Sequence, residues 1–276
     1  MRKKYMQDML QRRMGFDELG KAYPKDSSVK VEPITINGIS CFWFTPEQAI
    51  TNKVIVYLHG GAFAVGSIRS HESMVSHFAS RFQTKILFID YSLAPEHPYP
   101  GGMNDVLAVY STLQKQYPDY TFTLMGDSAG GGLAISSIAA MFDHNLSLPQ
   151  VVVLLSPWIS LTCTNPSHQQ NADKDIINTE YLKAAAKDYI GDNPMEKASP
   201  EFLTFNAFPP VLILAGEEEI LLDDSNNFYA YIRKIQKESY LHVYKKQKHV
   251  WTLASIQSEA SQQALKVIAE FLENNS

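Results

Sequence analysis

The segment with the most chemical information spans residues 126–130 and reads Gly-Asp-Ser-Ala-Gly, the pattern G-x-S-x-G. A β-branched, apolar run at 121–125 precedes it and predicts a buried strand, whereas the Ala-, Ile- and Leu-rich run at 130–141 predicts a buried helix. Small residues allow a sharp turn between the two, which leaves the Ser128 hydroxyl exposed above the sheet edge. The free N–H groups at the start of the helix favour negative charge there. The segment predicts a nucleophilic serine, although so short a pattern also occurs in ordinary turns.

A second segment supplies candidate hydrogen-bond donors for a developing oxyanion. The predicted strand at 54–58 is followed by His-Gly-Gly-Ala-Phe at 59–63, and a glycine-rich loop upstream of the nucleophile is the expected source of such donors. Glycine lets the backbone turn its N–H groups inward and approach a substrate closely. We expect the N–H groups of Gly61, Ala62 and Ala129 to form the oxyanion hole, each contributing about 3–4 kcal/mol of transition-state stabilisation. The alternative is a plain Gly-Gly turn.

These two segments, with a third at 90–100 that reads Asp-Tyr-Ser-Leu-Ala-Pro-Glu-His-Pro-Tyr-Pro, resemble the hormone-sensitive lipase family of α/β-hydrolases. The resemblance runs from about Ile55 to the C-terminus, and the three motifs occur in the family's order. It implies an α/β-hydrolase fold and a carboxylesterase activity that needs neither a metal nor an organic cofactor.

The resemblance also assigns structural roles and shows one departure. The family's loop usually reads His-Gly-Gly-Gly, whereas this chain has Ala62 at the third glycine, which narrows the loop's conformations but keeps its N–H group. By the same resemblance, Asp90 and Glu96 are anchors that brace the loops around the site, and His59 braces the oxyanion loop. None of these three is expected to take part in the chemistry.

The acid of a catalytic triad should follow a late strand, because an α/β-hydrolase presents its triad in the order Ser, acid, His. The predicted strand at 211–215 runs into 216–224, which contains five carboxylates. Alignment with the family pattern places the acid at Glu219, where aspartate is usual. Asp223 remains the alternative acid, and would otherwise cap the following helix.

The expected base is His249, one of eight histidines in the chain. It follows the predicted strand at 241–244 and precedes the final predicted helix, which is where the family places its catalytic histidine. Apart from His59, the other histidines are interpreted as surface or core residues: His71, His77, His97, His144, His168 and His242.

Alternating short apolar and longer amphipathic runs predict the elements that position these residues. A mostly parallel, eight-stranded sheet with helices on both faces is expected, with an antiparallel hairpin at Asn37-Gly38. The expected strands are 31–36, 39–44, 54–58, 86–90, 122–125, 151–155, 211–215 and 241–244, and the expected helices are 69–82, 103–116, 128–141, 223–237 and 253–274.

Two stretches fall outside this alternation. Residues 1–30 have a helical spacing of Met and Leu, and residues 158–210 are too long for an ordinary connection and contain a helix-like part at 176–190. We expect a single α/β-hydrolase domain, 1–276, in which these two stretches form a helical cap over Ser128. The aromatic residues nearby predict an apolar acyl pocket, and the candidates are Phe63, Trp158, Phe202 and Phe205. The alternative is that these aromatics only pack the cap onto the sheet.

Composition excludes several other classes. The net charge of -5 argues against a nucleic-acid or anionic-membrane surface. Cys41 and Cys163 lie in apolar surroundings and are interpreted as buried thiols, which favours a cytoplasmic protein. The first 13 residues lack the apolar core of a signal peptide, and no apolar run is long enough to span a membrane. A homodimer is possible, but no feature of the sequence decides it.

The sequence therefore predicts a serine carboxylesterase that hydrolyses short- to medium-chain esters of small molecules through an acyl-enzyme. Two alternatives remain open at this stage. One is an amidase or peptidase of the same fold, since the triad does not distinguish these leaving groups. The other is a non-catalytic ligand-binding homologue, a class that typically has lost the serine or the histidine.

Overall fold

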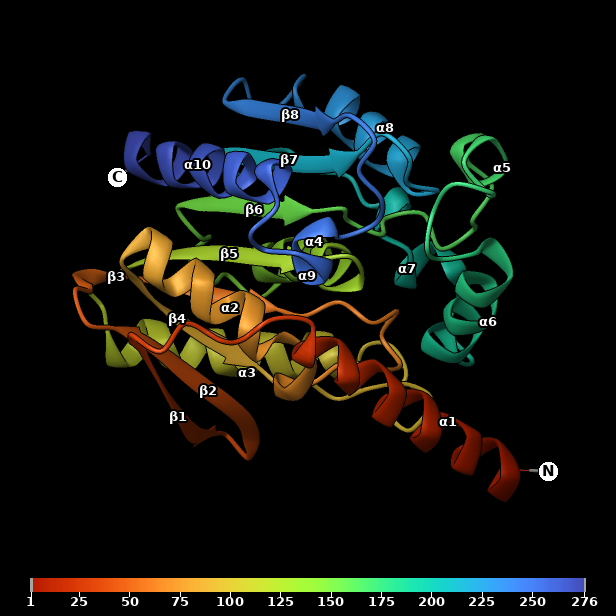
Figure 1. The fold of residues 1–276 in the computed structure, drawn as a ribbon, viewed down its shortest axis with the longest axis horizontal. Coiled ribbons are helices and arrows are strands. Elements are labelled where there is room, and N and C mark those ends of the chain that lie inside the picture. Colours follow the sequence, from red (N-terminus) through yellow and green to blue (C-terminus); the bar gives the residue numbers. More distant parts are fainter. Residues whose placement is uncertain (1, 276) are drawn as a thin grey trace.

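An eight-stranded sheet runs through the centre of the protein in the order β1-β2-β4-β3-β5-β6-β7-β8 (Figure 1). The computed structural model describes residues 2–275. Strand β2 pairs antiparallel with β1 and with β4, and all the other neighbours are parallel, as predicted. The strands are β1 (Val29–Ile36), β2 (Ile39–Pro46), β3 (Ile50–Leu58), β4 (Thr84–Ile89), β5 (Thr121–Asp127), β6 (Val151–Leu155), β7 (Val211–Gly216) and β8 (Ser239–Tyr244).

Strand β3 shows why the sheet is covered on both faces. Successive side chains of a strand point to opposite faces, so Val54, Val56 and Leu58 enter one hydrophobic cluster, whereas Ile55 and Tyr57 enter the other. All five are buried. A strand that is apolar on both faces needs helices on both sides, which is the arrangement of a mostly parallel sheet.

Three helices cover each face of the sheet. Helices α2 (Ile68–Phe82), α9 (Trp251–Ala254) and α10 (Glu259–Asn274) pack in one hydrophobic cluster. Helices α3 (Gly101–Gln116), α4 (Ala129–Asp143) and α8 (Leu222–Ile232) pack in the other. The prediction of a single final helix at 253–274 is wrong, because α9 ends at Ala254 and α10 begins at Glu259. Ser258 caps α10 by accepting a hydrogen bond from the Ser261 N–H group.

The remaining helices gather at the end of the sheet toward which the parallel strands point (Figure 1). They come from two separate parts of the chain. The N-terminal part contains α1 (Arg2–Asp17) and η1 (Glu18–Lys21), and the connection between β6 and β7 contains α5 (Ser167–Gln170), α6 (Thr179–Ile190), α7 (Met195–Ala198) and η2 (Pro200–Phe202).

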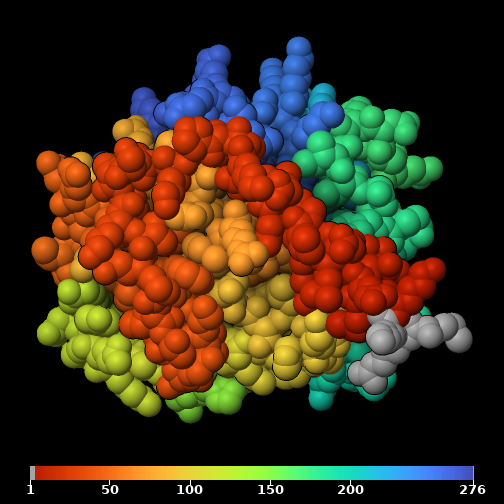
Figure 2. Space-filling model, turned by 60° about the horizontal axis from the view of Figure 1, so that its bottom comes forward, coloured from red at the N-terminus to blue at the C-terminus, as the bar shows by residue number. Residues whose placement is uncertain are grey.

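Polar contacts join the N-terminal helix to this end of the molecule. The Tyr5 hydroxyl donates to the Asp188 carboxylate on α6. Arg13 forms two hydrogen bonds of 2.7 Å to the two carboxylate oxygens of Glu96, and donates to the carbonyls of Ala64 and Ala94. Figure 2 shows the N-terminal segment, in red, crossing this face and meeting the green segment that contains α6. Glu96 therefore acts as the anchor that the resemblance implied.

The two cysteines are buried free thiols, as predicted. Burial raises the pKa of Cys41 and of Cys163 to about 12, so both remain protonated and serve as small apolar core residues. Among residues 2–275, no helix combines the length and the apolar character that a membrane crossing requires.

The turn between β5 and α4 consists of Ser128 alone. Its φ of 51° and ψ of -122° lie outside the regions favoured by residues with a side chain. The neighbouring Gly130 lets α4 approach β3 closely, because a Cβ atom on Gly130 would lie 2.0 Å from the Leu58 carbonyl oxygen. The small residues around Ser128 therefore permit the sharp turn that the sequence predicted at the end of β5.

We expect Gly130→Ala to lower the free energy of unfolding by about 1–3 kcal/mol, because the added methyl group must displace the backbone of β3. Gly15→Ala is the matched control: its Cβ would contact nothing within 4 Å, and it lies within α1. There alanine should stabilise the helix by about 0.5–1 kcal/mol. Urea unfolding of both variants measures the difference, and equal effects would contradict the close packing of α4 on β3.

Candidate active site

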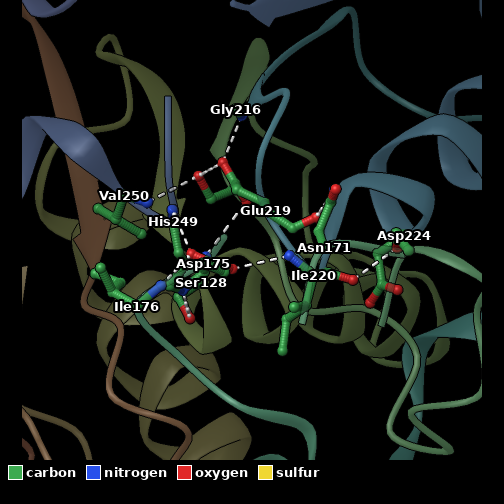
Figure 3. A network of polar contacts seen from close by, with 12 residues as sticks. Ser128, Asn171, Asp175, Ile176, Gly216, Glu219, Ile220, Asp224, His249 and Val250 are labelled. Carbon is green, nitrogen blue, oxygen red and sulfur yellow. Dashed lines mark hydrogen bonds and ion pairs between the residues drawn. The ribbon is translucent and has the colours of Figure 1, made fainter. Parts of the chain in front are cut away.

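Three side chains from three loops form one hydrogen-bonded chain at the carboxyl ends of the parallel strands (Figure 3). Ser128 follows β5, Glu219 follows β7 and His249 follows β8. The Nε2 atom of His249 lies 2.8 Å from Ser128 Oγ, and its Nδ1 atom lies 3.3 Å from Glu219 Oε2. All three residues are buried. The imidazole is thus held between a hydroxyl and a carboxylate, an arrangement in which it can accept a proton from the hydroxyl.

Glu219 is held on its far side as well. Its Oε1 atom accepts a hydrogen bond of 2.6 Å from Ser156 Oγ and one of 2.5 Å from the Gly216 N–H group. Burial raises the pKa of Glu219 above its ordinary value, while the hydrogen bonds from His249, Ser156 and Gly216 act in the opposite direction. These contacts leave Oε2 facing the imidazole, so the longer glutamate side chain still reaches Nδ1.

The pKa of His249 is raised above its ordinary value. Burial is the largest single influence and lowers it, but the hydrogen bond and charge of Glu219, together with the charges of Asp175 and Asp127, outweigh burial. Opposite charges within a few ångströms favour the charged form of a group. The site therefore stabilises the imidazolium that forms when the imidazole takes up a proton.

The alternative acid, Asp223, is directed elsewhere. Its Oδ2 atom accepts a hydrogen bond of 2.8 Å from the Ser167 N–H group, and it makes no hydrogen bond to His249 among the described residues. The prediction that Asp223 caps α8 is wrong. The N-cap residue of α8 is Leu221, and Asp223 lies within the first turn of the helix. Asp223 instead ties the start of α8 to the start of α5.

The loop after β3 places backbone donors beside Ser128. Gly61 has a φ of 118° and Ala62 a φ of 53°. A positive φ is uncommon for a residue with a side chain, such as Ala62. Both residues border the same cavity as Ser128. Among the hydrogen bonds of residues 2–275, none uses the N–H group of Gly61, Ala62 or Ala129. These three donors are available to a bound ligand.

Asp127 joins this loop to the serine turn, a role that the sequence analysis did not assign. Its Oδ1 atom accepts hydrogen bonds of 2.7 Å from the Tyr57 hydroxyl and 3.0 Å from the Gly60 N–H group. His59 is fully buried and stacks on Tyr91 at a ring-centroid distance of 4.3 Å, so it braces the loop as the resemblance implied. The acidic residue directly before the serine was the only signal that could have pointed to this contact.

A cavity of about 110 Å³ opens at Ser128 and is bounded mainly by apolar side chains. The residues that line it are Phe16, Leu19, Gly61, Ala62, Asp127, Ser128, Ile176, Ile177, Tyr181, Leu182, His249, Val250, Leu253 and Ala254. Phe16 and Leu19 come from the N-terminal part, and residues 176–182 come from the connection between β6 and β7. The two stretches predicted to overhang the serine thus both contribute to this wall. Among residues 2–275, no group of three or more His, Cys, Asp or Glu side chains is placed to hold a metal ion.

The four aromatic residues predicted for the pocket do not line this cavity. Phe63 stacks on Tyr189 of α6 at a centroid distance of 3.8 Å, and its ring lies 5.5 Å from that of Trp158. Trp158 and Phe205 are buried, whereas Phe202 is 45% exposed. These rings pack the connection onto the sheet or face solvent, because aromatic content indicates burial but not the direction in which a side chain points.

The comparisons with known proteins agree with this fold. A sequence profile described as the alpha/beta hydrolase fold matches residues 55–253. An esterase from Acinetobacter venetianus is 31% identical over 260 residues, which cover 92% of this chain and 86% of that protein. An acetyl-hydrolase from Streptomyces hygroscopicus is 33% identical over 218 residues, which cover 78% of this chain and 73% of that protein.

Solved structures give the same result. An esterase from the bacterial hormone-sensitive lipase family has a TM-score of 0.91 and 33% identity, and the match covers 95% of this chain and 90% of that one. The esterase EstE5, in a crystal soaked with p-nitrophenyl butyrate, has a TM-score of 0.91 and 32% identity over 97% of this chain and 91% of that one. The chain belongs to the hormone-sensitive lipase family of α/β-hydrolases, an enzyme class of carboxylic ester hydrolases.

The contact between His249 and Glu219 generates a prediction about the pKa of the imidazole. Burial lowers the pKa of His249, and Glu219→Gln removes the carboxylate charge that opposes this effect. We therefore expect the pKa of His249 to fall below the ordinary histidine value of about 6.5. Asp223→Asn removes the same charge from a residue that does not contact the imidazole, and should leave the pKa nearly unchanged. Titration of the His249 ring protons by NMR measures both, and equal shifts in the two variants would contradict the pairing.

Proposed function

We propose that the protein is a serine carboxylesterase in which Ser128 is the nucleophile, His249 the base and Glu219 the acid of a catalytic triad. The observation that carries the proposal is the position of the imidazole, with Nε2 2.8 Å from Ser128 Oγ and Nδ1 3.3 Å from Glu219 Oε2. A hydroxyl, an imidazole and a carboxylate in this order activate a serine on several unrelated folds.

The reaction proceeds in two steps. His249 takes the proton of Ser128 as its Oγ attacks the ester carbonyl, and the N–H groups of Gly61, Ala62 and Ala129 hold the oxyanion. The imidazolium then protonates the departing alcohol. The acyl group remains bound to Ser128 Oγ as an ester. In the second step His249 removes a proton from water as its oxygen attacks the acyl carbonyl. The imidazolium then returns that proton to Ser128 Oγ as the acyl–oxygen bond breaks, which releases the carboxylic acid and restores the free serine. Throughout, Glu219 stabilises the imidazolium and holds its Nδ1–H toward itself.

We propose further that residues 1–30 and 158–210 form a cap, within a single domain, that limits the substrate to short- and medium-chain esters. The cavity beside Ser128 holds only about 110 Å³, and both stretches supply apolar side chains to its wall. A small, covered, apolar pocket favours a compact apolar acyl group. The acetyl-hydrolase among the relatives and the butyrate ester soaked into EstE5 support this class of substrate.

The nucleophile is tested by Ser128→Ala, which removes the attacking oxygen from a turn that alanine also fits. Turnover of p-nitrophenyl butyrate should fall by about 10⁶-fold, and labelling by a fluorophosphonate, which reacts quickly only with an activated serine, should be abolished. A wild-type protein that binds esters but resists the label would instead be a non-catalytic ligand-binding homologue. Near-normal turnover in Ser128→Ala would overturn the whole assignment.

The limit on acyl-chain length is tested with p-nitrophenyl esters. Activity should be best on chains of roughly two to eight carbons. Leu182→Ala enlarges the cavity and should raise the ratio of kcat/KM for octanoate to that for acetate by about 10-fold, the order expected for methylene-sized changes in an apolar pocket.

Leu265→Ala is the matched control, because Leu265 is as buried as Leu182 but belongs to α10 and does not line the cavity. Its octanoate-to-acetate ratio should equal that of the wild type. Hydrolysis of long-chain triacylglycerol emulsions faster than of butyrate esters by the intact protein would refute the closed cap.

A further inference from the structure

A short segment before α6, residues 171–175, contacts both loops that carry the acid and the base (Figure 3). Asn171 lies at its start, and its Nδ2 atom donates hydrogen bonds of 2.8 Å to the Glu219 carbonyl and 3.1 Å to the Glu217 carbonyl. Lys174 in turn donates to Asn171 Oδ1 at 3.0 Å. The segment thus holds the main chain of the loop that presents Glu219.

The carboxylate of Asp175, at the end of this segment, extends the contact to the histidine loop. Its Oδ1 atom accepts a hydrogen bond of 3.0 Å from the His249 N–H group, and its Oδ2 atom accepts one of 2.8 Å from the Ile220 N–H group. Oδ1 also accepts from the Ile176 N–H group at 2.8 Å. One side chain therefore bonds the backbone of the base and the backbone of the residue directly after the acid.

The histidine loop lies outside regular helix and strand, and it is held by the Glu218 N–H bond to the Gln247 carbonyl, 3.0 Å, together with side-chain contacts of this kind. It lies between the end of β8 and the start of α9, and Val250 in it has a φ of 44°. A β-branched residue is strained at positive φ, and such strain persists only where the surroundings fix the backbone. Here two side chains do so, Asp175 at the His249 N–H group and Ser156 Oγ at the Val250 N–H group, 3.1 Å away.

We propose that Asp175 is a positioning residue of the triad. It sets His249 against Glu219 by accepting hydrogen bonds from the backbone N–H group of His249 and from that of Ile220, the residue after Glu219. The inference rests on the proposed function of the triad. It also connects the cap with the chemistry, since the next residue, Ile176, lines the cavity and is held by the same carboxylate. A substrate that presses on this part of the wall therefore acts on the loop that holds the base.

Asp175 also contributes charge to the site. The charged groups that act on the His249 ring are Glu219, which is bonded to it, and the carboxylates of Asp175 and Asp127, and all three favour the imidazolium. The one cation on the segment, Lys174, is directed at Asn171. Removing the charge of Asp175 should favour the neutral imidazole, so the rise of kcat/KM on the acidic side of the pH profile should move to lower pH.

The test compares Asp175→Asn with Asp173→Asn in the full-length protein, with p-nitrophenyl acetate as substrate. Asp173 lies two residues earlier on the same segment, is exposed, and makes none of these hydrogen bonds. We expect Asp175→Asn to lower kcat by about 10- to 100-fold, since small misplacements of a catalytic group cost this much. KM should stay near its wild-type value, and the acidic limb should move to lower pH. Asp173→Asn should leave kcat and the acidic side of the pH profile unchanged.

Asp175→Glu separates position from charge and serves as the test if the asparagine variant does not fold. It retains the charge but displaces the acceptor oxygens by a methylene, so kcat should fall while the acidic limb stays in place. A kcat equal to that of Asp173→Asn in a folded Asp175 variant overturns the inference. This result is distinct from failure of the proposed function, which would appear as retained activity in Ser128→Ala.

Discussion

The interaction on which the rest of the structure depends is the pair of bonds made by the His249 imidazole. Both ring nitrogens are engaged in a buried site, one by a hydroxyl and one by the carboxylate of Glu219. A buried carboxylate that loses its partner destabilises a protein strongly, so the loops that carry these groups must keep their positions closely. This requirement explains why Glu219 is also held by Ser156 and Gly216. It also explains why the two loops are joined both by a backbone bond, from the Glu218 N–H group to the Gln247 carbonyl, and by the side chain of Asp175.

The parallel sheet supplies the rigidity that these loops need. Strands β5, β7 and β8 end at the same edge, so residues far apart in the chain meet there without long connections. Ser128, Ala62 and Val250 all have positive φ, and such backbone strain persists where a well-packed framework determines it. This backbone geometry directs the Ser128 hydroxyl toward His249 Nε2, although the residue is buried and not exposed above the sheet as the sequence predicted. In the loop after β3 it leaves the N–H groups of Gly61 and Ala62 without a partner among the described residues.

Residues 1–30 and 158–210, the proposed cap, add two features that the sheet alone does not have. They supply apolar side chains to the cavity wall beside Ser128, and electrostatic stabilisation by fixed N–H donors is stronger where such a wall excludes water. Through Asn171 and Asp175, residues 158–210 also bond to the loops that carry Glu219 and His249. Ile176, which lines the cavity, and Asp175, which bonds the His249 backbone, are neighbours on one segment. If the proposed roles of cap and triad hold, changes in specificity and in turnover are expected to be coupled.

Local patterns in the sequence determined much of this result. Short apolar runs predicted all eight strands, and the G-x-S-x-G and His-Gly-Gly-Ala motifs indicated Ser128 and the loop after β3, because strands, tight turns and glycine positions are set by neighbouring residues. Only the tertiary structure decided the matters that depend on side-chain direction and on contacts between distant segments. It turned Glu219 toward His249 and Asp223 toward Ser167, directed the predicted pocket aromatics into packing or solvent, and brought Asp175 to the histidine loop. No motif marks such contacts, since the partners are separated by tens of residues and meet only when the sheet and cap are assembled.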